Sequence, residues 1–131
     1  MIVNILRFSF KDATTEKEKA AVLAAMRRTA SIESAEFGVV GQDIGDPAEG
    51  FTHTYCAGVA DLAALERYMH DPVHLDGDRV ILPHIQKISA VRLSDDMDPG
   101  LGAKVMALHQ AKVAKYPEWE AQLAAIPESP F

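Results

Sequence analysis

Tyr68 and His74, six positions apart, are the two side chains of this sequence best suited to proton transfer. Pro72 lies between them. Because proline has no N–H and disfavours the helical conformation in the residue before it, a helix through Tyr68 should end near Asp71. His74 is then expected on a following loop, from which it could fold back towards Tyr68.

The chemistry that this pair could perform is acid–base catalysis. An imidazole with an ordinary pKa of about 6.5 could take a proton from a carbon next to a carbonyl or from a hydroxyl. A phenol could donate a hydrogen bond to the oxyanion that develops. In the competing interpretation, His74 caps a helix end or bonds a backbone carbonyl and does no chemistry.

Other polar side chains near this segment also have two interpretations. Asp71 could orient a histidine, but a turn residue before a proline is the preferred interpretation. His53 shares a strand face with Tyr55 and could add a donor to a pocket, or it is a core or dimer-interface histidine. His70 and His74 have the spacing of a helical zinc pair. The proline between them argues against a continuous helix, so we expect neither a metal nor a cofactor.

Composition limits the class of protein and its partners. A chain of 131 residues has the length of one domain, and 48% hydrophobic residues suffice for a core. The formal net charge of −6 argues against nucleic acid or an anionic membrane as partner. The single cysteine, Cys56, fits a reducing compartment. No signal peptide or membrane-spanning run is evident, so the sequence predicts a cytoplasmic protein.

Periodicity and helix-start signals divide the first 95 residues into elements. Residues 2–10 alternate, which predicts a strand with one strongly apolar face. Thr15 and Glu18 can form a capping box, and Asp61 can cap a second helix. The expected elements are strand 2–10, helix 16–30, strand 37–40, strand 51–59, a helix from 62 to about 71, a short helix at 80–82 and strand 87–93.

This order predicts an α+β fold of the ferredoxin-like type, β-α-β-β-α-β, with a four-stranded antiparallel sheet and helices on one face. The other face also carries apolar residues, so we expect a homodimer. Two more helices are expected at 103–116 and 118–126. A domain of residues 1–96 is thus followed by a helical extension, 97–131, which could cover a sheet edge, cap a pocket or brace the dimer.

Three segments carry a family resemblance by their order and spacing. They are a first strand that ends Phe10-Lys-Asp12, the segment Gly50-Phe-Thr-His53, and Tyr68 followed by Asp71-Pro-Val-His74. Over residues 2–95 they resemble the stress-responsive dimeric α/β barrel (Dabb) family. The resemblance implies that two monomers close their sheets into a barrel, and that each holds a small-molecule pocket between its helices and sheet.

The resemblance also implies roles for residues. In a plant polyketide cyclase of this family, the tyrosine and the last histidine of the motif form the catalytic pair, and Tyr68 and His74 occupy those positions. The chain departs from the cyclase at Asn4 and Asp71, where the cyclase has histidines, so its substrate is not carried over. The expected lining of the pocket is His53, Tyr55, Asn4, Leu6, Phe8, Leu65, Ile85 and Ile88.

Three functional hypotheses remain open from the sequence. The first is a lyase or cyclase without a cofactor, with His74 as base and Tyr68 as donor. The second is a non-catalytic, stress-related dimer that binds an apolar small molecule or only self-associates. The third, on fold analogy alone, is a cofactor-free monooxygenase. The first hypothesis requires that the Tyr68 hydroxyl and His74 face one cavity.

Overall fold

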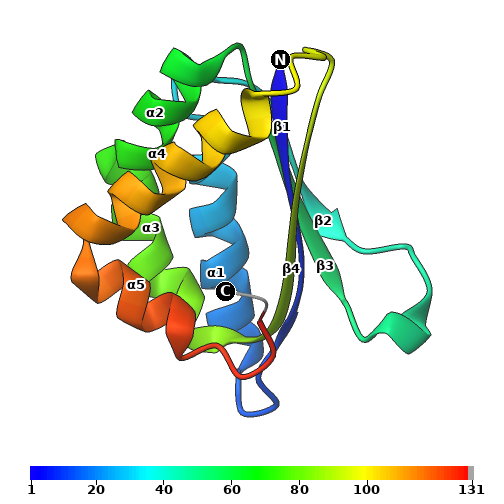
Figure 1. Cartoon of the computed structure of the whole chain (residues 1–131). Coiled ribbons are helices and arrows are strands. Elements are labelled where there is room, and N and C mark those ends of the chain that lie inside the picture. The colour runs from blue at the N-terminus through cyan, green and yellow to red at the C-terminus, as the bar shows by residue number, and fades with distance from the viewer. Residues whose placement is uncertain (130–131) are drawn as a thin grey trace.

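The computed structural model describes residues 1–129 as a four-stranded antiparallel sheet with helices packed on one face (Figure 1). In chain order the elements are β1 (Ile2–Phe10), α1 (Glu16–Thr29), β2 (Ala35–Gln42), η1 (Pro47–Glu49), β3 (His53–Val59), α2 (Leu62–His70), α3 (Pro72–Ile81), η2 (Leu82–His84), β4 (Ile85–Ser94), α4 (Leu101–Lys115) and α5 (Pro117–Ala124). The strand order β2-β3-β1-β4 confirms the ferredoxin-like architecture. Across residues 1–129, no helix combines the length and the apolar character that crossing a bilayer requires.

β1 is a central strand, antiparallel to β3 on one side and to β4 on the other. Its alternation is the predicted one, with Ile2, Asn4 and Phe8 buried towards the helices. Asn4 lies opposite Ala57 of β3 and opposite Arg92 of β4. The antiparallel register therefore places a buried amide beside a guanidinium on the helix-covered face.

The segment after Pro72 is a helix, α3, and not the predicted loop. Pro72 is its first residue, where the missing N–H costs little because the first-turn N–H groups of a helix have no intrahelical acceptor. Asp71 caps the helix by accepting from the N–H of Val73 at 2.8 Å. His74 thus lies in the first turn of α3. The apolar residues expected as a short helix at 80–82 are the end of α3 and the start of η2.

The remaining elements lie where they were predicted, with ends that shift by at most two residues. The capping box of α1 is confirmed, since Thr15 Oγ1 accepts from the Glu18 N–H at 3.1 Å and the Glu18 carboxylate accepts from the Thr15 N–H at 2.9 Å. The strands differ most: β2 covers 35–42 instead of 37–40, β3 begins at 53 instead of 51, and β4 covers 85–94 instead of 87–93. Pairing extends β2 and β4 beyond their most apolar residues.

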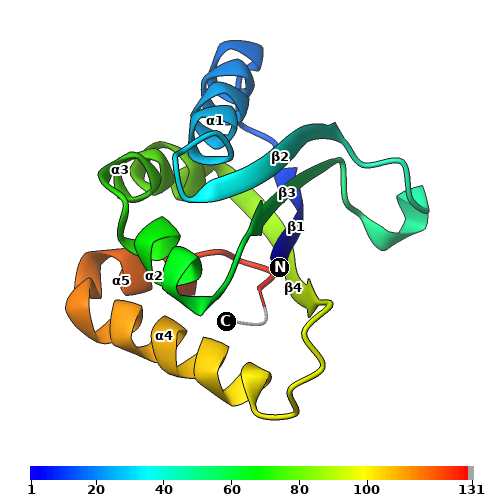
Figure 2. The same cartoon turned by 90° about the horizontal axis from the view of Figure 1, so that it is seen from above.

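The C-terminal extension folds over the helices and reaches a sheet edge (Figure 2). α4 packs on α2, and α5 packs on α3. Beyond α5, Glu128 lies beside β4, where its carbonyl accepts from the Ile88 N–H at 2.9 Å and its N–H donates to the Gln86 carbonyl at 3.0 Å. The extension therefore covers part of an edge of the sheet and closes over the space between sheet and helices.

The other face of the sheet is not covered by the helices of residues 1–129 (Figure 1). Two rows of residues cross its four strands, Val39-Cys56-Ile5-Val91 and Phe37-Gly58-Val3-Leu93. Large apolar side chains at the ends of both rows are exposed, with exposed fractions of 66% for Val39 and 57% for Val91. We call these two rows the bare face.

Candidate functional site

A cavity of about 120 Å³ lies between the sheet and the helices. Engineered cavities of about 150 Å³ bind benzene, so this space suits a small molecule. Most of the predicted site residues line it, namely Asn4, Leu6, Tyr55, Leu65, Tyr68, His74, Ile85 and Ile88. Two others, Phe8 and His53, are not part of this lining. The cavity thus brings together the tyrosine and the histidine on which the enzymatic hypothesis depends.

Two buried tyrosines share a hydrogen bond at the cavity. Tyr68 comes from the last turn of α2 and Tyr55 from β3, and their hydroxyl groups are bonded to each other. Burial raises the pKa of both phenols. Either hydroxyl can be the donor of the shared bond. When Tyr55 is the donor, the Tyr68 proton is available to another acceptor.

The two ring nitrogens of His74 have different partners: Nδ1 bonds the backbone, and Nε2 lies near Asp78, which also lines the cavity. Its Nδ1 lies 2.8 Å from the carbonyl oxygen of Tyr68, so Nδ1 carries a proton and donates it there. Its Nε2 lies 3.5 Å from Oδ2 of Asp78, one turn further along α3. Burial lowers the pKa of His74, and Asp78 opposes that shift. At neutral pH the ring is therefore an uncharged base, with its lone pair on Nε2.

Sequence reasoning missed a set of charged groups that also lines the cavity, formed by Asp78, Arg92 and Lys112. Lys112 is 2% exposed, and its Nζ lies 4.0 Å above the centroid of the Trp119 ring. Burial lowers its pKa to about 8, against the attraction of Asp78. Asp78 in turn accepts from Trp119 Nε1 at 2.8 Å.

A signal for Lys112 was present in the sequence. The apolar stripe of the predicted helix runs through Leu101, Val105 and Leu108 at spacings of four and three, and the next position of that stripe is Lys112. A lysine at a position of this apolar stripe is a signal, because lysine is rarely buried without a partner. Asp78 had no comparable signal, because its spacing of four residues from His74 brings the two together only on a helix, and a loop was predicted there.

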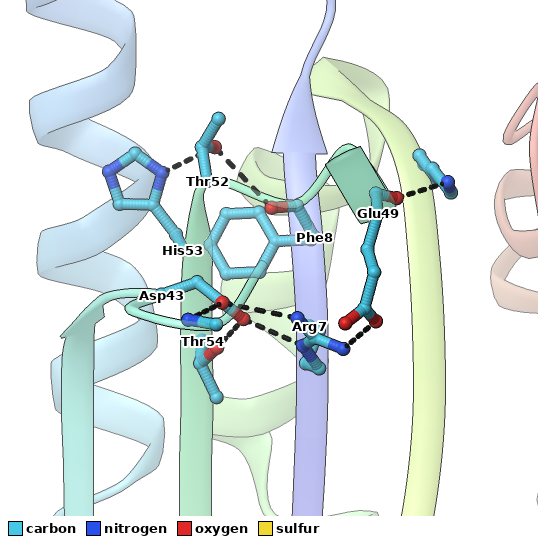
Figure 3. Close-up of polar contacts among 9 residues, drawn as sticks. Arg7, Phe8, Asp43, Glu49, Thr52, His53 and Thr54 are labelled. Atoms are coloured by element: carbon cyan, nitrogen blue, oxygen red, sulfur yellow. Dashed lines mark hydrogen bonds and ion pairs between the residues drawn. The ribbon is translucent and has the colours of Figure 1, made fainter. Parts of the chain in front are cut away.

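His53 faces the helix-covered side of the sheet, as strand parity predicted, but lies outside the cavity. Its ring stacks on Phe8 at a centroid distance of 5.6 Å and meets Phe10 edge-on at 5.2 Å. Its Nδ1 is 2.8 Å from Thr52 Oγ1 (Figure 3). Burial lowers its pKa. In this structure His53 therefore packs with aromatic rings at one end of the sheet.

A neighbouring polar cluster holds the loop between β2 and β3 (Figure 3). Arg7 donates to Asp43 Oδ2 at 2.7 Å and to Glu49 Oε2 at 2.6 Å, and Thr54 donates to Asp43 Oδ2 at 2.6 Å. These bonds raise the pKa of Arg7 and lower that of Asp43. Arg7 and Thr54 point to the bare face, so this cluster borders that face and not the cavity.

The two histidines with the spacing of a helical zinc pair, His70 and His74, lie on different helices. His70 ends α2, and its Nδ1 is 3.0 Å from the hydroxyl of Tyr116, whereas His74 belongs to α3. Within residues 1–129, no group of three His, Cys, Asp or Glu side chains lies together in a way that could hold a metal ion.

A ferredoxin-like sheet with a small-molecule cavity under its helices and a bare opposite face defines the class of protein. Within that class, the chain belongs to the stress responsive A/B barrel domain (Dabb) family, whose profile matches residues 2–95. The match ends before α4, so Lys112 and Trp119 lie outside it. No curated protein sequence matches the chain.

Solved structures support the same fold. A hydroxynitrile lyase from Passiflora edulis is 20% identical with a TM-score of 0.65, covering 75% of this chain and 96% of its own. A Dabb family protein with a ferredoxin-like fold from Mesorhizobium loti is 22% identical with a TM-score of 0.62, covering 71% and 94%. A dimeric ferredoxin-like protein of unknown function from Thermobifida fusca is 22% identical with a TM-score of 0.63, covering 71% and 89%. At these identities the likeness establishes the fold.

Proposed function

We propose that this protein is a cofactor-independent lyase or cyclase that works as a homodimer, with His74 as general base and Tyr68 as hydrogen-bond donor. The observation that carries the proposal is that both groups line one cavity. Their rings lie 4.6 Å apart between centroids. A substrate oxygen at the Tyr68 hydroxyl would place the adjacent carbon or hydroxyl near Nε2 of His74.

In both reactions of the proposal, His74 first accepts a proton and later gives it back. In the enolising form, Nε2 of His74 takes a proton from the carbon next to a carbonyl; the C–H electrons form a C=C bond and the π electrons of the C=O bond move to the oxygen, which Tyr68 stabilises. In the lyase form, Nε2 takes the proton of a hydroxyl, a C=O bond forms, and the adjacent C–C bond breaks with its electrons on the leaving carbanion. His74 then returns the proton. Asp78, 3.5 Å from Nε2, favours the charged imidazolium in between.

The proposed homodimer uses the bare face. Isolated monomers seldom expose a continuous apolar sheet face, and Val39 and Val91 lie in the same row across all four strands. A second copy of the same face is self-complementary under two-fold symmetry. The Thermobifida fusca protein of the same fold is described as dimeric, which supports this assignment. Light scattering at micromolar concentration should give twice the mass of 14.3 kDa.

The test of the enzymatic proposal compares two histidine variants on two defined substrates. Cleavage of mandelonitrile to benzaldehyde reports the lyase form, and deuterium incorporation at the methyl group of acetophenone in D2O reports enolisation. His74→Ala should abolish either activity while the protein stays folded and dimeric. His70→Ala is the matched control, because His70 bonds Tyr116 and does not line the cavity. Activity that survives His74→Ala would refute the role of His74.

A specific observation favours the alternative, a non-catalytic dimer that binds a ligand. The bond from Nδ1 of His74 to the Tyr68 carbonyl joins α3 to α2, which is also what a purely structural histidine would do. In that case His74→Ala lowers thermal stability or disrupts the dimer, and no substrate of either class is turned over. Because this bond exists under either proposal, turnover of the two substrates by the wild-type protein, lost in His74→Ala, is what separates them.

A further inference from the structure

The cavity has a positive charge although the chain as a whole is acidic. The formal net charge of the chain is −6. Among residues 1–129, the charged side chains that line the cavity are Asp78, Arg92 and Lys112, so one carboxylate faces two cations and leaves a formal charge of +1. Asp78 is already engaged by Trp119 Nε1. An anion in the cavity would restore neutrality.

Among residues 1–129, Lys112 is a buried cation with no carboxylate at ion-pair distance. It is 2% exposed on α4, its Nζ lies 4.0 Å from the centroid of the Trp119 ring, and Asp78 attracts it from beyond ion-pair distance. Lysines are almost never fully buried unless they are paired, because an isolated ammonium loses its hydration. A cation–π contact with tryptophan compensates part of that loss. A ligand anion would compensate the rest.

Asn4 supplies an independent observation, a buried donor with no acceptor. Its Oδ1 accepts from Arg92 Nε at 2.8 Å, which fixes the orientation of the amide. Its Nδ2 is then buried without a hydrogen-bond partner among residues 1–129, at a side chain that lines the cavity. A buried unpaired donor costs free energy that an acceptor on a ligand would recover. Donors thus reach the cavity from β1, β4 and α4.

We propose that the cavity binds the carboxylate of a small apolar acid, with Lys112 and Arg92 as the cationic side and Asn4 Nδ2 as a neutral donor. The inference rests on the proposed function in that it uses the same cavity and names its ligand class. One net positive charge matches a carboxylate, which is a monoanion, better than a phosphate dianion. Apolar side chains such as Leu65, Ile85 and Ile88 take the rest of the ligand.

The C-terminal extension contributes residues to this site that lie outside the family match. Lys112 and Trp119 come from α4 and α5, beyond the last residue of the family match, while Asn4 and Arg92 lie within it. The family portion therefore supplies the reactive pair, and the extension supplies the buried cation that selects the ligand.

The experiment measures binding of benzoate and of its neutral analogue benzamide. Trp119 is the only tryptophan of the sequence and lines the cavity, so its fluorescence reports occupancy, with isothermal calorimetry as an independent readout. Benzoate should bind at least about tenfold more tightly than benzamide, since bonds to ionised groups are about twice as strong as neutral ones. Lys112→Met should remove that preference. Lys115→Met, three residues further on the exposed side of α4, should leave it unchanged.

A second variant keeps the proposal falsifiable if Lys112→Met folds poorly. Asn4→Leu has a similar volume and removes the unpaired donor, and it should weaken benzoate more than benzamide. Equal binding of the two probes, no benzoate binding, or unchanged benzoate affinity in both variants would overturn the carboxylate site, whatever His74→Ala does to turnover. Loss of benzoate binding in Lys112→Met without any His74-dependent turnover would sustain the site and refute the enzymatic proposal.

Discussion

Replacing Lys112 by methionine should make the protein more stable, although it removes a binding residue. The pKa of Lys112 falls from 10.5 to about 8 in the folded protein. Each pKa unit corresponds to 1.36 kcal/mol, so keeping the ammonium charged in the cavity costs about 3 kcal/mol. The contact with Trp119 returns about 1 kcal/mol of that. We therefore expect Lys112→Met to raise the free energy of unfolding by about 2 kcal/mol at pH 7.

The stability difference between the wild type and Lys112→Met should depend on pH, because Lys112 loses its proton at a lower pH in the folded protein than in the unfolded chain. Below about pH 8 the lysine is charged in both the folded and the unfolded chain, and the full cost is present. Between about pH 8 and pH 10.5 the folded protein releases this proton while the unfolded chain retains it, so the stability of the wild type rises. The advantage of Lys112→Met should therefore shrink across that window.

Urea unfolding at pH 7 and at pH 10 measures both effects, with Lys115→Met as the control that removes the same charge from an exposed position. The control should change the unfolding free energy by less than about 0.5 kcal/mol. A Lys112→Met protein that is less stable than the wild type at pH 7 would refute the reasoning, because it would mean that Asp78 and Trp119 more than compensate the buried charge. A gain that is constant between pH 7 and pH 10 would refute the assigned titration.

Three further predictions concern the reactive pair and the bare face. Burial lowers the pKa of His74 below its usual 6.5, so the acidic limb of the pH–rate profile should have its midpoint below pH 6.5. A midpoint of this limb at or above pH 6.5 would contradict a neutral buried base. Tyr68→Phe leaves the Tyr55 hydroxyl without its partner and should lower the free energy of unfolding, measured in urea, by about 1 kcal/mol. The same substitution should reduce turnover, and full activity of the variant would exclude Tyr68 as the donor. Val39→Glu places a charge in the bare face and should give a monomer by light scattering, whereas Val80→Glu, on the helical side, should remain dimeric.

Local signals predicted the elements well because they act over a few residues. Thr15 and Glu18 mark the start of α1 through bonds that they make with each other. Pro72 was harder to interpret, since the same residue that stops one helix is favoured as the first residue of the next. The sequence predicted the end of α2, but the helix that carries His74 depends on the Asp71 cap as well.

The cavity was predictable only in part because it is assembled from segments far apart in the chain. Asn4 and Arg92 become neighbours through the register of β1 and β4. Strand parity gave His53 the correct face of the sheet, but could not say at which end of that face the cavity lies. A lysine on a helical stripe can also extend its ammonium to solvent, so only the packing of α4 shows that Lys112 faces inward.

The backbone bonds between Glu128 and β4 bear on how copies of this protein can associate. A free strand edge is a template on which another chain can add a strand, and repeated addition leads to open-ended aggregates. Here the chain's own tail occupies the β4 edge at residues 86–88. Removing that tail should therefore expose an unpaired strand edge and favour fibrous or higher-order assembly, whereas the proposed face-to-face pairing of the intact chain would close at two copies.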